Sequence, residues 1–286
     1  MDNKRKPYQL VSREWKKENT VIHLKNTSIG SSYINVIAGP CAVENEDQIF
    51  TICEFLSKHD IKLLRGGAYK PRTSPYSFQG LKKEGLIMMK AAADKFDMNV
   101  VTEVIDTSVM DEVYQYADVL QVGTRNMQNY QLLRALSKID KPVLLKRGMS
   151  STLEEWLLAA EYILSGGNEK VILCERGIRT FENSTRNTLD LSIVPLVKSL
   201  SHLPIIVDPS QGTGVRDLVS PMCIASIAAG ADGIMVEVHN HPEEALSDGP
   251  QSLYFDQLQK LLPQIEKAAR IYNRNVDFNF NEKTLI

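Results

Sequence analysis

The chain alternates short apolar runs with amphipathic segments, and this alternation restricts its fold more than any other feature. Eight runs of strand length begin 20 to 36 residues apart. Their apolar character is nearly continuous, which is typical of parallel strands that are covered on both faces. The runs begin at Val36, Leu63, Asn99, Val119, Pro142, Val171, Pro204 and Gly233.

The segments between these runs have helical periodicity. In the last segment, Phe255, Leu258 and Leu262 follow the spacing of a helix face that packs on a core. Eight strand–helix units over about 235 residues predict an α/β fold, a (β/α)8 TIM barrel, at residues 36–286. A doubly wound open sheet is the alternative, but it usually has fewer units at this length, and no G-x-G-x-x-G motif follows the first strand.

Residues 1–35 precede the predicted barrel. The stretch from Thr20 to Gly39 has two β-like runs around a polar turn that contains Gly30. This pattern predicts a β-hairpin, which we expect to plug the N-terminal end of the barrel. The residues before it are polar and too few for a domain, so we expect a short N-terminal arm. The predicted organisation is therefore an arm and hairpin at 1–35 and a catalytic barrel at 36–286.

Composition excludes several classes of protein. The net charge is -2, from 33 basic and 35 acidic residues, whereas a general nucleic-acid binder is usually basic. The N-terminus is charged and no apolar run approaches 18 residues, so we expect neither a secretory signal nor a membrane span. The four cysteines have no C-x-x-C spacing, which argues against a disulfide scaffold or a zinc ribbon. We expect a cytoplasmic protein without nucleic-acid or membrane partners.

Basic residues gather at the ends of the predicted strands. In TIM barrels the site forms at the carboxyl ends of the strands, so these side chains should converge. Arginine binds phosphate and carboxylate with a planar fork, and lysine adds a point charge. A polyanion is therefore the expected ligand: a phosphorylated acid, a sugar phosphate, or both. The residues are Arg65, Lys70, Arg72, Arg125, Lys146, Arg147 and Arg176.

A second group combines a thiol with carboxylates. Cys41, Glu237 and Asp248, together with Asp208, follow separate strands and could hold one divalent metal ion. Spacing alone favours the alternative that Cys41 is a small buried residue. His239 lies two residues after Glu237, but single histidines are more often structural.

Several motifs resemble one family closely. GPCAVE, KPRTSPYSFQGL, QVGTRNMQN, LLKRGM, ILCERGIRTFE and MVEVHNHPEEALSDGPQSL are similar to the type I-beta branch of 3-deoxy-D-arabino-heptulosonate 7-phosphate (DAHP) synthase, in order, from Val36 to the C-terminus. The resemblance implies a metal-dependent transferase on a (β/α)8 barrel. It condenses phosphoenolpyruvate with erythrose 4-phosphate, the first step of the shikimate pathway to the aromatic amino acids.

The same resemblance implies roles for the strand-end residues. Lys70 would protonate the new alkoxide, and Glu103 would act as a base or orient water. Asp208 is also predicted to be a catalytic residue. The family is usually a homotetramer or homodimer, so we expect a homo-oligomer. Phosphoenolpyruvate would contact Arg65, Lys70, Arg125, Lys146 and Arg176; erythrose 4-phosphate would contact Pro71, Arg72 and Thr73; and a divalent metal (Mn²⁺, Fe²⁺, Zn²⁺ or Co²⁺) would be held by Cys41, Glu237 and Asp248.

The chain departs from the family at one ligand position. The family has Asp-Pro-Ser-His where this chain ends the motif with Gln211. An amide oxygen is a weaker donor than imidazole for transition metals. The site could bind metal more weakly or prefer a harder ion, it could use another donor such as His239, or the chain could be a paralogue with a different acceptor aldehyde. We expect that a metal still binds, because the other three ligands remain.

Two further alternatives stay open. A sister family makes 3-deoxy-octulosonate 8-phosphate from arabinose 5-phosphate, but it typically has Lys-Ala-Asn-Arg-Ser where this chain has Lys70 to Ser74 as KPRTS. A catalytically weak binding homologue is the other, and Gln211 is the feature that favours it.

Family members regulated by aromatic amino acids often carry a fused regulatory domain. The stretch before the barrel is too short for one, so we expect no inhibition by phenylalanine or tyrosine through such a domain.

Overall fold

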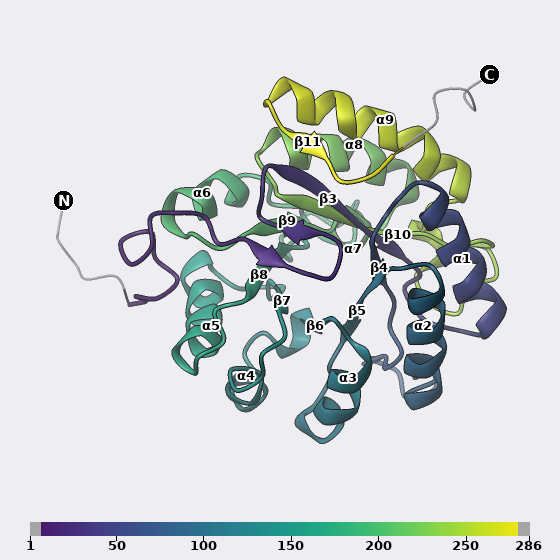
Figure 1. Cartoon of the computed structure of the whole chain (residues 1–286), viewed down its shortest axis with the longest axis horizontal. Coiled ribbons are helices and arrows are strands. Elements are labelled where there is room, and N and C mark those ends of the chain that lie inside the picture. Colours follow the sequence, from purple (N-terminus) through teal and green to yellow (C-terminus); the bar gives the residue numbers. More distant parts are fainter. Residues whose placement is uncertain (1–6, 280–286) are drawn as a thin grey trace.

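The computed structural model describes residues 7–279. Within them, eight parallel strands form a closed barrel in chain order, and the last strand pairs with the first (Figure 1). This confirms the predicted TIM barrel and excludes the open sheet. The barrel strands are β3 (Tyr33–Gly39), β4 (Leu63–Arg65), β5 (Asn99–Glu103), β6 (Val119–Val122), β7 (Val143–Lys146), β8 (Val171–Glu175), β9 (Ile205–Val207) and β10 (Gly233–Glu237).

Helices surround the barrel and cover its outer face (Figure 1). Local signals explain where they begin: the Asn45 side chain accepts the Gln48 N–H at the first helix, and Thr152 and Glu155 form a capping box at the fifth. In residues 7–279, no helix is both long and apolar enough to cross a bilayer. The helices are α1 (Glu46–Lys58), α2 (Lys83–Lys95), α3 (Met110–Tyr116), α4 (Tyr130–Leu136), α5 (Leu153–Ser165), α6 (Ile193–Leu200), α7 (Pro209–Thr213), α8 (Arg216–Ala228) and α9 (Phe255–Ile271), with 3₁₀ turns η1 (Thr107–Val109), η2 (Thr124–Asn126) and η3 (Gly249–Gln251).

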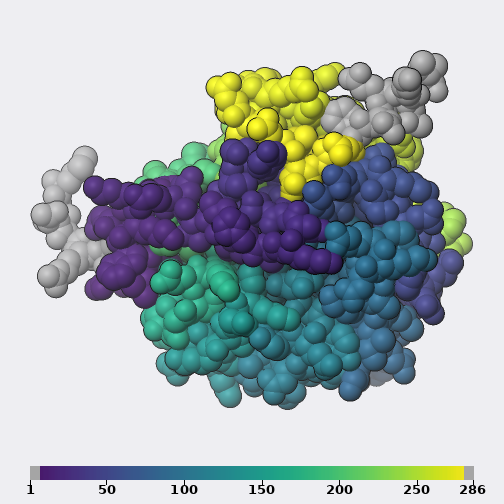
Figure 2. All heavy atoms as spheres, viewed as in Figure 1, coloured from purple at the N-terminus to yellow at the C-terminus, as the bar shows by residue number. Residues whose placement is uncertain are grey.

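A hairpin closes one end of the barrel interior. Strands β1 (Ile22–His23) and β2 (Ser28–Ile29) pair antiparallel, so a hairpin does precede the barrel. Its turn lies before Ser28 and not around Gly30 as predicted, and the second predicted run, Tyr33–Gly39, is the first barrel strand. Ile22 and Ile29 are buried in the same cluster as the inward-facing residues of the barrel strands. Asn26 accepts a hydrogen bond from Asn99 at the start of β5, which sets the hairpin at the N-terminal end. The N-terminal segment, purple in Figure 2, lies across this face of the molecule.

The arm before the hairpin packs on the outside of the barrel. The Glu161 carboxylate, on α5, accepts the backbone N–H groups of Gln9, Leu10 and Val11. Residues 1–6 of the predicted arm lie outside the described residues. At the other end of the chain, β11 (Asn275–Val276) pairs with β3. This strand was not predicted, because two residues are too few to have a detectable period.

The strand ends carry the polar residues toward one opening. Parallel strands in a closed barrel all present their carboxyl ends at the same face. β4 ends at Arg65, β5 at Glu103, β7 at Lys146 and β10 at Glu237. The apolar residues of these strands are buried, and the polar residues Arg65, Glu103 and Lys146 at the strand ends line the opening. We call this opening the mouth.

Candidate active site

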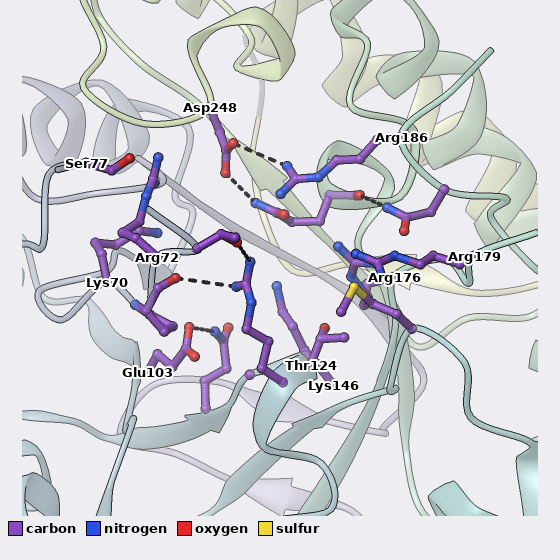
Figure 3. A pocket seen from close by; sticks show the side chains of 18 of the residues that line it. Lys70, Arg72, Ser77, Glu103, Thr124, Lys146, Arg176, Arg179, Arg186 and Asp248 are labelled. Atoms are coloured by element: carbon purple, nitrogen blue, oxygen red, sulfur yellow. Dashed lines mark hydrogen bonds and ion pairs between the residues drawn. The ribbon is translucent and has the colours of Figure 1, made fainter. Parts of the chain in front are cut away.

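The mouth is a cavity of about 390 Å³ (Figure 3). It is lined by strand-end and loop residues from most of the barrel. Cys41, Asp208 and Glu237 lie deeper and are almost fully buried. The residues singled out from the sequence that line the cavity are Arg65, Lys70, Pro71, Arg72, Thr73, Glu103, Arg125, Lys146, Arg176, Gln211 and Asp248.

Four of the arginines that line the mouth form a set that we call the basic half: Arg72, Arg125, Arg176 and Arg179. Arg72 lies on the side of Lys70 and Ser77, across the cavity from Arg176 and Arg179 (Figure 3). Within residues 7–279, no carboxylate forms an ion pair with any of these guanidinium groups. Arg125 instead donates to the Pro71 carbonyl and the Thr73 hydroxyl, at 3.4 and 3.5 Å. Arg176 is 4% exposed, and burial lowers its pKa. These cations lack a partner that an anionic ligand would supply.

Three other cations at strand ends are already paired. Arg147, which the sequence grouped with the anion-binding residues, instead pairs with Glu175 and Asp190 at 3.0 and 2.9 Å and does not line the cavity. The Lys146 Nζ atom lies 2.6 Å from Asp208 Oδ2, and the Arg65 Nη1 atom lies 3.0 Å from Glu237 Oε1. Burial opposes the charge on Asp208, but Lys146, Arg65 and the Gln211 backbone N–H outweigh it and hold its pKa below the ordinary value. Breaking the Lys146 or the Arg65 pair would leave a buried carboxylate unpaired.

Glu103 lies beside the basic half and carries a carboxyl group, so its charge is opposite to that of the four arginines. Burial raises the pKa of Glu103, and the nearby Lys70 and Lys146 offset part of that effect. Gln121 donates to its Oε2 atom at 3.3 Å. A Cβ atom at position 123 would lie 2.0 Å from Glu103 Oε1, so a side chain there would displace the Glu103 carboxyl group. A carboxyl group with a raised pKa is suited to proton exchange near neutral pH.

Beside the basic half lies a group that we call the thiol–carboxylate group: Cys41, Glu237 and Asp248. One ligand atom from each lies within 4.8 Å of the others. Thiolate and carboxylate are common donors to divalent transition metals, so these three residues fit such an ion. Burial raises the pKa of Cys41 to about 12. At Asp248 burial is outweighed by Arg186 and by hydrogen-bond donors, which lower the pKa to about 2.

Gln211 and His239 occupy different surroundings. The Gln211 Nε2 atom donates to Glu237 Oε1 at 2.5 Å and to Asp248 Oδ2 at 3.0 Å. The amide therefore sits against the thiol–carboxylate group. His239 contacts Gln48 and Glu44 instead, with its Nε2 atom 2.9 and 3.6 Å from their side chains. The structure thus gives no support to His239 as a replacement ligand.

Several residues of the site were missed from the sequence. Arg186 pairs with Asp248 at 3.2 Å (Figure 3), Gln251 donates to Glu237 at 2.6 Å, and the Ser247 hydroxyl contacts Cys41 and Arg72. Arg179 lines the cavity. The signal for the two arginines was present, because the loop after β8 carries Arg176, Arg179 and Arg186. Ser247 and Gln251 lie in the loop after β10, inside the MVEVHNHPEEALSDGPQSL motif, from which only Glu237 and Asp248 were singled out as site residues.

A (β/α)8 barrel with a basic mouth and a metal-type ligand group is an enzyme of the class that acts on phosphorylated small molecules. The sequence profile described as the DAHP synthetase I family matches residues 17–274. The chain therefore belongs to the DAHP synthetase I family, as its motifs predicted.

Two kinds of curated relative were found. The chain is 56% identical over 264 residues to phospho-2-dehydro-3-deoxyheptonate aldolase of Thermotoga maritima, covering 92% of this chain and 78% of the relative. It is 30% identical over 262 residues to 2-dehydro-3-deoxyphosphooctonate aldolase of Syntrophobacter fumaroxidans, covering 85% and 90%. Sequence similarity is therefore much greater to the heptonate than to the octonate enzyme.

Solved structures give the same result. The chain is similar to crystalline phospho-2-dehydro-3-deoxyheptonate aldolase (DAHP synthase) of Thermotoga maritima, with a TM-score of 0.93 and 54% identity over 96% of this chain and 80% of that one. A truncated form of the Thermotoga maritima 3-deoxy-D-arabino-heptulosonate 7-phosphate synthase matches with a TM-score of 0.88 and 50% identity, over 93% and 98%.

Proposed function

We propose that this enzyme condenses phosphoenolpyruvate, erythrose 4-phosphate and water to DAHP and phosphate. The observation that carries the proposal is a cavity lined by arginines without carboxylate partners and by Asp248 of the thiol–carboxylate group, whose Cys41 and Glu237 are buried. The 56% identity to a heptonate aldolase over 92% of the chain supports the same reaction. The first step of the shikimate pathway is the corresponding metabolic role.

Phosphoenolpyruvate is assigned to the deeper part of the mouth. Its phosphate and carboxylate need several donors at once, and Arg65, Lys70, Arg125, Lys146 and Arg176 provide them. Arg176 has no carboxylate partner in the described chain, so an anion beside it gains a full charge-assisted interaction. Lys146 and Arg65 are held in place by their buried carboxylates, which reduces the cost of ordering them on binding.

Erythrose 4-phosphate is assigned to the segment Lys70–Ser74. Arg72 and Thr73, with the backbone of Pro71, would hold its phosphate. Arg125 donates to Pro71 and Thr73 and so connects this segment with the phosphoenolpyruvate side. The alternative acceptor is arabinose 5-phosphate, which would give the octulosonate product. The KPRTS segment and the lower, 30% identity to an octonate aldolase favour the four-carbon acceptor.

The residues support a balanced sequence of bond changes. C3 of phosphoenolpyruvate forms a carbon–carbon bond with the aldehyde carbon, using the electrons of the C2=C3 double bond, and the Lys70 ammonium gives a proton to the aldehyde oxygen. Water adds at the electron-deficient C2 and gives one proton to Glu103. The C2–O bond to phosphate then breaks, the C2 hydroxyl becomes a carbonyl, and its proton leaves with the phosphate. Asp208 keeps Lys146 charged and in position. A divalent metal held by Cys41, Glu237 and Asp248 would supply Lewis acidity toward the aldehyde oxygen.

Phosphate release tests the proposal. Purified enzyme is incubated with phosphoenolpyruvate and either erythrose 4-phosphate or arabinose 5-phosphate, after chelation and again after addition of Mn²⁺, Fe²⁺, Zn²⁺ or Co²⁺. We expect release with erythrose 4-phosphate and a higher rate with added metal. Release with arabinose 5-phosphate alone would replace the proposal by the octulosonate reaction. No release with either acceptor would favour a binding homologue.

We also propose a homo-oligomer in a reducing, cytoplasmic compartment. Tyr76 and Phe181 are 97% and 100% exposed, and aromatic residues are enriched in protein–protein interfaces. The four cysteines are all free and buried. Light scattering on the purified chain tests the assembly, and a monomer at micromolar concentration would contradict it.

A further inference from the structure

The backbone of Gln211 is held in one position. Gln211 lies in α7, directly after β9, and Asp208 caps this short helix. The Gln211 N–H donates to Asp208 Oδ1 at 2.9 Å, and its carbonyl accepts from Asn187 Nδ2 at 3.0 Å. Both backbone groups are therefore fixed by side chains from outside the helix. These two hydrogen bonds fix the position of the Gln211 Cα atom, and therefore the place from which its side chain extends toward the thiol–carboxylate group.

The orientation of the Gln211 amide follows from its neighbours. Glu237 Oε1 and Asp248 Oδ2 both accept from the amide nitrogen. Ionised carboxylates cannot donate, so the reverse orientation would set the amide oxygen against two acceptors. The Gln211 NH₂ group thus bridges the two carboxylates, in the way that a cation shared between them would.

Both carboxylates have their charge balanced by protein groups. Arg65 pairs with Glu237, and Arg186 pairs with Asp248. Glu237 also accepts from Gln251, so each of its oxygens has a donor. The two negative charges therefore meet two positive charges, and the amide of Gln211 satisfies the acceptor sites between them. Carboxylates whose oxygens have hydrogen-bond and ion-pair partners, here the buried Glu237 and the partly buried Asp248, do not require a metal to keep their geometry.

We propose that Gln211 is a resident substitute for a metal ion: its amide nitrogen bridges Glu237 and Asp248 in the metal-free enzyme and has to be displaced before a divalent ion binds. Gln211 is then a positioning residue that competes with the metal and is not one of its ligands. This inference rests on the metal site under the proposed function. It assigns to this chain a weak and readily reversed metal site.

The proposal predicts the sign of one substitution. If Gln211 competes with the metal, Gln211→Ala removes the competitor and metal binds more tightly. If Gln211 is a ligand through its carbonyl oxygen, Gln211→Ala removes a donor and metal binds more weakly. The two roles therefore move the affinity in opposite directions. Melting of the metal-free protein is a second readout, because the carboxylates lose their shared donor.

The experiment measures Mn²⁺ binding to the full-length chain after chelation, from the free Mn²⁺ signal in electron paramagnetic resonance. We expect Gln211→Ala to bind Mn²⁺ about tenfold more tightly than wild type, since a hydrogen bond to a charged group is worth at least that factor. The metal-free variant should melt at a lower temperature than metal-free wild type. Gln264→Ala, at an exposed site on α9, is the matched control and should change neither value.

Two results would overturn the proposal, and they are distinguishable. Weaker or equal Mn²⁺ binding by Gln211→Ala, with wild type still binding, would make Gln211 a ligand or a bystander. No Mn²⁺ binding by wild type, Gln211→Ala or Gln211→His would remove the metal site itself, and displacement with it. Phosphate release with erythrose 4-phosphate, measured on the same samples, reports the proposed reaction separately.

Discussion

The basic half and the thiol–carboxylate group differ in whether their charged side chains have partners within the protein. In the basic half, Arg72, Arg125, Arg176 and Arg179 have no carboxylate partner within the described chain. In the thiol–carboxylate group, Glu237 and Asp248 each have an arginine and share the Gln211 amide. The basic half therefore lacks partners until an anion binds. The other group is complete before a metal binds.

This difference separates cations that are available to bind an anionic ligand from cations that stabilise the fold by pairing with a carboxylate. Arg176 is the buried member of the basic half, and an unpaired buried cation lowers stability until an anionic ligand binds to it. A paired cation contributes to stability, and its removal exposes a buried opposite charge. Substitutions in the two sets should therefore divide between loss of stability and loss of activity.

Lys146→Met should have the largest effect. It leaves Asp208, which is fully buried, without its ammonium partner, and such broken pairs cost about 3–5 kcal/mol of unfolding free energy. Activity should be lost as well. Urea denaturation measures the loss. The double variant Lys146→Met/Asp208→Asn removes both charges and should recover much of the stability; if it is no more stable than the single variant, the ion pair is not the cause.

Arg176→Ala should reduce activity strongly without a comparable loss of stability. Arg176 is buried and unpaired, so its partner is expected to be the bound anion. Truncating one side of a buried charge pair costs about 2–5 kcal/mol, or roughly 1000-fold in kcat/KM for phosphoenolpyruvate. Steady-state kinetics and urea denaturation are measured together. A loss of stability as large as that of Lys146→Met would contradict the division between the two sets.

Glu103→Gln should change the pH dependence of activity. Burial raises the pKa of Glu103, so its basic form is lost at a higher pH than for an ordinary glutamate as the solution becomes more acid. The wild-type profile of kcat/KM should therefore fall on the acid side. In the variant this limb should disappear, with a plateau about 100-fold lower. An unchanged acid limb would assign it to another group.

Arg179→Ala should have the smallest effect. Arg179 is exposed at the rim of the mouth, where solvent screens its charge. We expect about a threefold lower kcat/KM at low salt, and a difference that vanishes as ionic strength rises. Kinetics at two salt concentrations test this. A loss as large as that of Arg176→Ala would place Arg179 against the substrate and enlarge the binding set.

The barrel and much of its mouth could be predicted from sequence because their signals are local and periodic. Each barrel strand is an apolar run, and Arg65, Glu103, Lys146 and Glu237 are the last residues of their strands. The closed parallel barrel then brings such ends together without further information. The KPRTS and Asp-Pro-Ser segments marked the same positions by resemblance.

Contacts between loops could not be predicted in this way. Arg186 and Asp248 are 62 residues apart, and Gln251 reaches Glu237 from a 3₁₀ turn. Loop paths have no period, so spacing does not say which of their side chains meet. The same holds for β11, whose two residues pair with β3 from the opposite end of the chain.

Gln211 shows what could be learned from the sequence and what required the tertiary structure. The sequence by itself determined the alternation of strands and helices, the strand-end cations and the substitution at residue 211, because these depend on residue identity and order. The tertiary structure alone decided that the Gln211 nitrogen faces Glu237 and Asp248, and that Arg65 and Arg186 balance them. The physical reason is that a hydrogen bond or ion pair depends on the position of both partners. The barrel brings these partners together from β4, the loop after β8, α7, β10 and the loop after β10.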